Sequence, residues 1–314
     1  MRQARRRVPH RRLGWSCALA ALLSMATGNA TAQSDAEPEA RALSGVLKRV
    51  KDSRAVRLGV REAAVPFAMA GASRQPFGYS IDLCLEIVDD LALAVGVTAL
   101  RVEYRQVTPS DRIDQVVDGR IDLECGATTN TAERRQRVAF SPLIFIAGTR
   151  LLVKRGSPVR SLQDLAARRV VVVRGTTNAD VMRRLASGGA QPISLLVVDD
   201  YAAAVDKVAS GEVAALAADD ILLAGYLAER GLRRDFAIVG DLLSYEPYAI
   251  MFARDDPALA DVVNAAFTRL ATSGDLRSIY YKRFLRPLPS GVRLGVPMTP
   301  RLQRSFEVLG LPPE

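Results

Sequence analysis

Histidine is almost absent from this chain of 314 residues, because His10 is the only one and it lies in an N-terminal segment that does not resemble part of a fold. Without histidine the rest of the chain cannot build a Ser-His-Asp triad, a histidine zinc site or a histidine pH switch. The sequence therefore predicts neither a metal site nor a cofactor.

Long apolar runs are absent as well. The run Cys17–Ala26 has about ten residues, whereas a helix that spans a bilayer needs about 20. It follows a basic segment and precedes Ala30-Thr31-Ala32, which has the small-x-small form of a cleavage site. This order predicts a cleaved signal peptide over residues 1–32 and export to the periplasm. Arg11-Arg12 leaves the twin-arginine route open beside general secretion.

A strong excess of charge is missing from the predicted mature chain. The formal net charge of +9 falls to +3, because residues 1–32 contain six arginines and no Asp or Glu. A protein with so small a positive charge has little general attraction for nucleic acid. We therefore expect no nucleic-acid partner.

Cysteine is scarce, and only Cys84 and Cys125 remain after residues 1–32. An even pair in an oxidising compartment favours a disulfide. Two buried free thiols are the alternative.

Short β-rich runs alternate with helical patterns along the chain, which predicts an α/β fold with mainly parallel sheets. Two such rounds of about 100 residues each predict two lobes flanked by helices. A ligand cleft is expected where strands end and helices begin. The predicted boundaries are a signal peptide over 1–32, an N-terminal lead-in over 33–50, lobe 1 over 51–147 and 248–286, lobe 2 over 148–247, and a C-terminal tail over 287–314.

The spacing of apolar residues also predicts individual elements. It indicates a helix over Ser80–Ala94, a strand over Tyr248–Phe252, and helices over Asp256–Thr272 and Gly274–Phe284. The last 28 residues are rich in Pro and Leu, and we expect them to form a tail wrapped on the surface.

The segment 124–141 is the most informative motif of the chain. It is typical of a strand end, a turn of small residues from Gly126 to Thr129, and a first helical turn that carries Arg134. Small residues leave room for a ligand, and a guanidinium can bind a carboxylate through two hydrogen bonds. The motif predicts a grip on the α-group of a free amino acid. An ordinary strand-loop-helix with surface arginines is the alternative.

Seven segments together resemble the periplasmic solute-binding proteins of amino-acid ABC transporters, family 3, and most of all the glutamate/aspartate-binding branch. The resemblance covers most of residues 55–285 and implies the two-lobed, type II periplasmic-binding-protein fold. The segments are Val60-Arg-Glu-Ala-Ala-Val-Pro-Phe67, Gly78-Tyr-Ser-Ile-Asp82, Arg112-Ile113 with Asp118-Gly-Arg-Ile-Asp122, Glu124 to Pro142, Gly148-Thr-Arg-Leu-Leu152, Gly175-Thr-Thr177 and Asp219-Asp-Ile-Leu-Leu-Ala-Gly225.

The resemblance implies a role for the residues that grip the α-group. Arg134 falls on the position that holds the α-carboxylate, and Thr129, Thr176 and Thr177 fall where hydroxyl and N–H groups complete this grip. Asp219 matches the acid that accepts the α-ammonium. A helix cap is the alternative for Asp219 and for the threonines.

The resemblance also implies a pocket for the ligand side chain. Arg61 and Arg112 match two arginines that face the side-chain carboxylate of an acidic amino acid, although solvated surface charges are the alternative. Ala127 and Tyr201 depart from the pattern, because Ser and His often stand there in acidic-ligand relatives. These departures leave the ligand open among Glu, Asp and neutral polar amino acids.

We therefore predict a monomeric periplasmic receptor that binds L-glutamate or L-aspartate and delivers it to a membrane ABC permease. Counting Arg61, Arg112 and Arg134 against Asp219 predicts a cleft surplus of +2, which suits an acidic ligand. One rival is an enzyme on the same fold, similar to cyclohexadienyl or arogenate dehydratases, whose general acid would be Glu62, Glu124 or Asp220. A signalling receptor domain that acts through a partner is another.

Overall fold

The computed structural model describes residues 43–71, 75–188, 192–288 and 291–312. The predicted signal peptide, the first residues of the lead-in and the last residues of the tail lie outside these ranges. Within them, no helix combines the length and the apolar character needed to cross a membrane.

The first sheet has five strands, in the order β5-β1-β6-β15-β7. Strands β1, β5 and β6 are parallel, and β15 is antiparallel to both of its neighbours. Four strands therefore run one way and β15 runs against them. The bounds are β1 Ala55–Val60, β5 Arg101–Gln106, β6 Leu123–Glu124, β7 Val138–Phe140 and β15 Met251–Ala253.

The second sheet repeats this arrangement, in the order β11-β10-β12-β9-β13. Strands β10, β11 and β12 are parallel, and β9 is antiparallel to β12 and β13. The predicted class, α/β with mainly parallel sheets, is confirmed in both. The bounds are β9 Thr149–Lys154, β10 Arg169–Val173, β11 Ser194–Val198, β12 Ala215–Asp219 and β13 Phe236–Val239.

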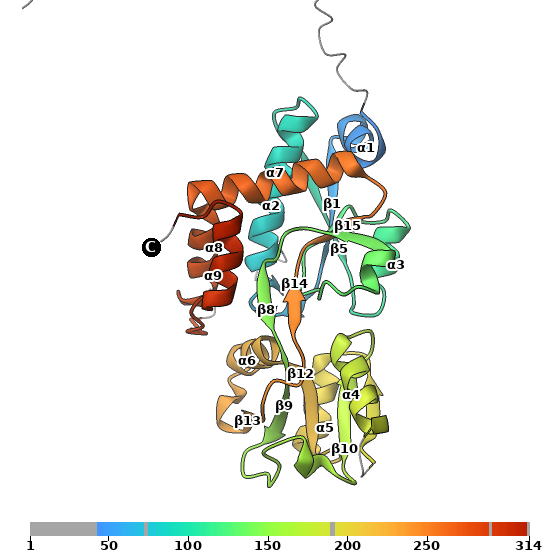
Figure 1. Cartoon of the computed structure of the whole chain (residues 1–314), viewed down its shortest axis with the longest axis vertical. Helices are drawn as coiled ribbons and strands as arrows, with labels where there is room; N and C mark the ends of the chain where they lie inside the picture. Colours follow the sequence, from blue (N-terminus) through green and yellow to red (C-terminus); the bar gives the residue numbers. More distant parts are fainter. Residues whose placement is uncertain (1–42, 72–74, 189–191, 289–290, 313–314) are drawn as a thin grey trace, which may run out of the picture. The chain divides into compact units, whose positions relative to one another are not determined.

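Two short antiparallel strands, β8 Phe145–Ala147 and β14 Glu246–Tyr248, pair with each other where the chain passes between the two sheets (Figure 1). Strand β9 follows β8 and β15 follows β14, so each crossing delivers the antiparallel strand of the sheet that it enters. A small third sheet consists of β2 Ala63–Ala64, β3 Ala68–Ala70 and β4 Pro76–Phe77.

Helices pack on both sheets. In the first half, α2 packs against α7 and α8, and α1 packs against α7; in the second, α4, α5 and α6 pack against β12. The bounds are α1 Gly45–Ser53, α2 Tyr79–Ala94, α3 Arg112–Val117, α4 Thr177–Gly188, α5 Tyr201–Ser210, α6 Asp220–Glu229, α7 Pro257–Ser273, α8 Asp275–Phe284 and α9 Pro300–Val308, with 3-10 turns at Arg134–Gln136, Gln163–Leu165 and Leu232–Arg234.

An aromatic cluster fills the core where β8, β14, α2 and α8 meet. The ring of Phe145 stacks on Phe284, and the ring of Phe67 meets Tyr248 edge-on. Such pairs add about 0.5–1.5 kcal/mol beyond the burial of their area. The cluster therefore holds the crossing strands against the first half of the molecule.

The predicted disulfide between Cys84 and Cys125 is present, with 6.2 Å between the two Cα atoms. Cys84 lies on α2 and Cys125 directly follows β6. The bond therefore ties α2 to the start of the turn that carries Gly126 to Thr129.

Two predicted elements were wrong. The strand expected over Tyr248–Phe252 is two strands, because Tyr248 pairs with Phe145 in the crossing pair whereas Met251 pairs with Glu124 in the first sheet. The surface tail contains α9, whose Leu302 and Phe306 are buried. Thr299 caps this helix by accepting from the Leu302 N–H, so a Thr-Pro start signal was present in the sequence.

Candidate ligand-binding site

Two turns of small residues meet where strands of the two sheets end. The first turn, Gly126–Thr129, follows β6, and the second, Gly175–Thr177, lies between β10 and α4. Arg134 joins them, since its Nη1 donates to the Thr129 carbonyl (2.9 Å) and its Nη2 donates to the Gly175 carbonyl (3.3 Å). The two turns are therefore held together by one guanidinium.

Gly175 makes this approach possible. Its φ is +73°, and a Cβ atom there would lie 2.5 Å from the Pro109 carbonyl oxygen. No side chain fits in that space, so the second turn can lie directly against the segment before α3.

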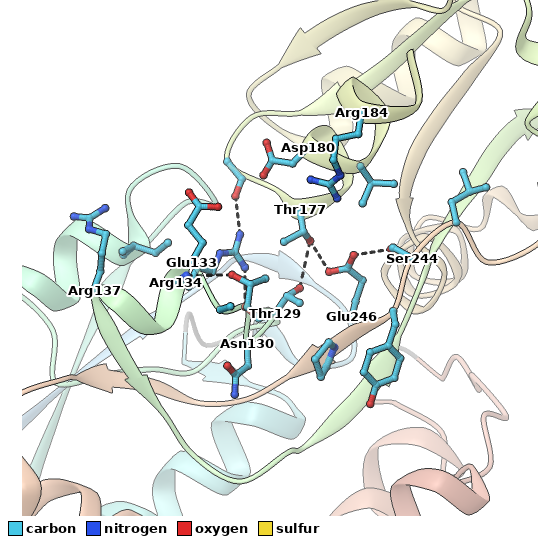
Figure 2. Close-up of a pocket in the computed structure, with 18 of the residues that line it drawn as sticks. Thr129, Asn130, Glu133, Arg134, Arg137, Thr177, Asp180, Arg184, Ser244 and Glu246 are labelled. Atoms are coloured by element: carbon cyan, nitrogen blue, oxygen red, sulfur yellow. Dashed lines mark hydrogen bonds between the residues drawn. The ribbon is translucent and has the colours of Figure 1, made fainter. Parts of the chain in front are cut away.

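A cavity of about 860 Å³ opens beside these turns (Figure 2). Its volume is within the range of small-molecule sites. Thr129, Arg134 and Thr177 are the predicted ligand residues that line it. The other lining residues are Ile113, Asn130–Glu133, Arg137, Gly175, Asp180, Val181, Arg184, Leu185 and Leu243–Pro247.

The three predicted arginines are buried, with Arg61 6%, Arg112 3% and Arg134 8% exposed. Within the described residues, none of them forms an ion pair with a carboxylate. Arg112 donates to the Ala127 carbonyl (3.2 Å), while its Nε has no partner. Burial, and then the charge of Arg134, lower the pKa of Arg112 to about 9. The surface-charge alternative is therefore wrong for these arginines.

The two departures from the family pattern lie beside the arginines. The Arg61 guanidinium stands over the Tyr201 ring, 5.6 Å from its centroid. Burial is the main cause that raises the pKa of Tyr201 to about 12, so its hydroxyl stays protonated. Ala127 provides only its carbonyl, which Arg112 contacts.

Asp219 is the last residue of β12 and directly precedes α6. Its carboxylate accepts hydrogen bonds from Asn178 Nδ2 (2.8 Å) and from the Tyr248 hydroxyl. It makes no cap hydrogen bond to α6, so the helix-cap alternative is wrong for its side chain. Burial, followed by the nearby charge of Glu246, raises the pKa of Asp219 to about 6.

The hydroxyls of the second turn have partners within the protein. Thr176 donates to the Val173 carbonyl (2.7 Å) and accepts from the Ala179 N–H (3.2 Å). Thr177 donates to Glu246 (2.6 Å), and its oxygen lies 3.4 Å from that of Thr129. Thr176 therefore caps α4, in agreement with the helix-cap alternative, and the N–H groups of Thr177 and Asn178 are the donors that the start of α4 offers to an anion.

Two buried carboxylates near the arginines were not anticipated as part of the ligand site. Glu124, 0% exposed, accepts from the Thr128 hydroxyl (2.6 Å) through one oxygen, and its other oxygen has no partner. Glu246, 2% exposed, accepts from Thr177 and from Ser244 (2.6 Å each). Glu124 stood inside the motif, but nothing in the sequence marked Glu246, Asn178 or Ser244.

These two residues correct the charge count. Both carboxylates act on the Arg134 charge together with Asp219. Three buried arginines thus face three buried carboxylates, and the predicted surplus of +2 is wrong. Within the described residues, no cluster of His, Cys, Asp or Glu could hold a metal ion.

Two sheets of the same strand order, joined by paired crossing strands with buried charges at the strand ends, define the type II periplasmic-binding-protein class. The chain matches the bacterial extracellular solute-binding proteins, family 3, over residues 56–286, and it belongs to this family. The family and the fold implied by the sequence are thereby confirmed.

Curated relatives have similar sequences over most of their length. The L-glutamate/L-aspartate-binding protein of Pseudomonas aeruginosa is 34% identical, over 83% of this chain and 87% of that protein. The glutamate/aspartate import solute-binding protein of Escherichia coli is 31% identical, over 86% of this chain and 88% of that protein.

Solved structures share the fold. An ancestral arginine-binding protein bound to arginine has a TM-score of 0.66 and 28% identity, over 73% of this chain and 98% of that chain. An ancestral amino-acid-binding protein described as a precursor of cyclohexadienyl dehydratase also has a TM-score of 0.66, over 76% of this chain and 99% of that chain. At 24% identity, that second likeness concerns the fold alone.

Proposed function

We propose that this protein is a periplasmic receptor that binds an acidic amino acid, L-glutamate or L-aspartate, and delivers it to a membrane ABC permease. The observation that carries the proposal is the set of three buried arginines that form no ion pair in the part of the chain that the structure describes. The named ligands of the curated relatives support it. The protein would act as a monomer and would leave the ligand chemically unchanged.

Unpaired buried cations are costly, and an anion that pairs with them recovers the cost. Arg134 already lies between the two turns, at the start of α4, where helix N–H groups favour a carboxylate. We assign the ligand α-carboxylate to this place. Arg61 and Arg112, beside Tyr201 and Ala127, would then bind the side-chain carboxylate.

Position, not net charge, supports an acidic ligand in a cleft with equal numbers of buried arginines and carboxylates. Asp219, held by Asn178 and Tyr248, is the acceptor for the α-ammonium. A zwitterion with a second carboxylate would satisfy both the acceptor and the three arginines. Glutamine or asparagine would leave Arg61 and Arg112 without a charged partner.

Export to the periplasm is part of the proposal. It rests on the basic segment, apolar run and cleavage pattern of residues 1–32, and on membership of a family of extracellular solute-binding proteins.

A second function is favoured by one observation, the unpartnered oxygen of Glu124. A buried carboxylate of this kind could assist loss of water from a substrate. Glu62 is exposed, and Asp220 accepts from the Ile221 and Gly148 N–H groups, so Glu124 is the candidate acid. Incubation with prephenate or arogenate tests this function, and an aromatic product would establish it.

Calorimetric titration with glutamate, aspartate, glutamine and asparagine tests the receptor. Glutamate or aspartate should bind roughly 10- to 150-fold more tightly than the amides, because one charge-assisted pair contributes about 1.5–3 kcal/mol. Replacing both Arg61 and Arg112 by Met should erase that preference. Arg137→Met is the matched control, since Arg137 lines the cavity but pairs with Asp114 at the surface. Equal or tighter binding of the amides to the wild type would contradict the acidic ligand.

A further inference from the structure

We propose that Glu246 is a second acidic residue of the ammonium site, which makes the receptor select ligands that carry an α-ammonium. This inference rests on the proposed function, since it assigns Glu246 to the same ligand. The observation is a buried carboxylate on the crossing strand β14, shared between hydroxyls and next to Asp219.

Both oxygens of Glu246 accept hydrogen bonds. Thr177 donates to Oε2 and Ser244 donates to Oε1, each at 2.6 Å (Figure 2). Within the described residues, Glu246 forms no ion pair. A carboxylate with two hydroxyl donors and 2% exposure therefore lacks a cation.

A chain of hydrogen bonds connects Asp219 to Glu246. Asn178 Nδ2 contacts both Asp219 (2.8 Å) and the Thr149 hydroxyl (2.7 Å), and the Thr149 and Ser244 hydroxyls lie 2.7 Å apart. Ser244 gives its proton to Glu246, so it accepts from Thr149. The chain therefore fixes the places of the two carboxylates relative to each other.

The direction of the hydrogen bond from Thr177 to Glu246 decides how the Thr177 hydroxyl can contact a ligand. Its single hydroxyl proton goes to Glu246, so toward a ligand its oxygen can only accept. An ammonium, with three N–H donors, matches an acceptor set of Asp219, Glu246 and the Thr177 oxygen. A carboxylate would be repelled by this set, so these groups belong to the ammonium end of the site.

The charges in the site also support a cation that Asp219 and Glu246 share. Glu246 is the leading charged neighbour that raises the pKa of Asp219, and it is also the leading charge that favours the cationic form of Arg134. A cation that binds between Asp219 and Glu246 would offset the repulsion between two buried negative charges. The ligand ammonium would supply that cation.

The alternative is a positioning role, in which Glu246 only holds Thr177 and the start of α4 in place. Glu246→Gln separates the two roles, because it keeps the shape and removes the charge. We expect this variant to bind glutamate roughly 10- to 150-fold more weakly, the loss of one charge-assisted pair.

Glutarate, which is glutamate without the ammonium, sharpens the test. Glu246→Gln and Asp219→Asn should both lose glutamate affinity while their glutarate affinity stays equal to that of the wild type or increases. Glu133→Gln is the matched control: it removes a carboxylate charge from an exposed residue that lines the cavity outside the hydrogen-bond chain, and should change both ligands alike.

Unchanged glutamate affinity of Glu246→Gln, or equal weakening for glutamate and glutarate, would overturn the assignment. Failure of the wild type to bind glutamate would instead overturn the proposed function.

Discussion

Two groups of arginines in the molecule differ in their burial and in their partners. Arg49 and Arg57 share the carboxylate of Asp122, and their side chains keep 31% and 23% exposure. Arg61, Arg112 and Arg134 are more deeply buried and form no ion pair within the described residues. The group that most needs a counterion is therefore the one that lacks it.

This difference separates a structural role from a binding role. The Asp122 carboxylate, 2% exposed, also accepts from the Arg57 N–H (2.7 Å), so it fastens α1 and β6 to β1. The site arginines contact backbone carbonyls and an aromatic ring, so within the described residues no carboxylate contacts them directly. The fold completes the first group by itself, whereas the second group is available to the ligand that we propose.

The largest expected effect is on stability and concerns the group of Arg49, Arg57 and Asp122. Asp122→Ala should lower the free energy of unfolding by about 3–5 kcal/mol, because it leaves two arginines without their shared partner. Urea unfolding measures this, with Asp118→Ala as a control whose exposed ion pair with Arg120 should contribute at most about 1 kcal/mol. Glutamate affinity of the folded variant should be retained. Similar losses for both variants would show that the Asp122 group is not a structural unit.

Arg134→Ala should affect ligand affinity more than stability. Its glutamate binding should weaken by about 2–5 kcal/mol, because the ligand carboxylate would lie unpaired in the cleft. The unliganded protein should lose less stability than Asp122→Ala does, since Arg134 contributes two hydrogen bonds to backbone carbonyls and, within the described residues, no ion pair. Arg135→Ala is the neighbouring control, because Arg135 is exposed and contacts Asn130. Near-wild-type titration of glutamate by Arg134→Ala would refute its assignment.

The smallest expected effect is a pH dependence at the acidic end of the site. The pKa of Asp219 is about 6, raised mainly by burial and by Glu246, with Asp220, Asn178 and Tyr248 also facing it. Since only the ionised form accepts an ammonium fully, glutamate affinity should fall roughly tenfold between pH 7 and pH 5. Calorimetry at both values measures this, and Asp219→Asn should lose the dependence. A flat wild-type profile would contradict the role of Asp219.

The same pKa shift acts on stability with the opposite sign. A raised pKa means that the folded protein binds this proton more tightly than the unfolded chain does. The contribution of Asp219 to the unliganded protein is therefore greatest below pH 4 and is lost as pH rises through about 6. Ligand should restore it at neutral pH, so ligand-induced stabilisation should grow over that range.

Much of the fold was predictable because local signals agreed with the tertiary arrangement. The alternation of strands and helices indicated both sheets, and the turn residues around Gly126 and Gly175 marked the strand ends that meet. Asp219 and Arg134 could be found because each follows a strand end within a recognisable motif. The Cys84–Cys125 pair needed only the even count and the expected compartment.

The features that could not be predicted from the sequence depend on contacts between residues that lie far apart in the chain. Glu246 binds Thr177, which lies 69 positions away, and no local pattern connects the two. The apolar run Tyr248–Phe252 favours extended structure throughout, but its break between two sheets follows from partners in β8 and β6. The predicted charge surplus of the site was wrong for the same reason, since burial of Glu124 and Glu246 is a property of the assembled molecule.

The position of β15 decides the order in which the two sheets can be completed during synthesis. The second sheet comes from one continuous stretch, from Thr149 to Val239, so it can assemble as soon as that stretch has emerged. The first sheet needs β15 between β6 and β7, and its core also needs Phe284 and Phe306. The half that contains Asp219 is therefore complete in sequence before the half that contains the three arginines, whose core depends on α8 and α9 near the end of the described chain.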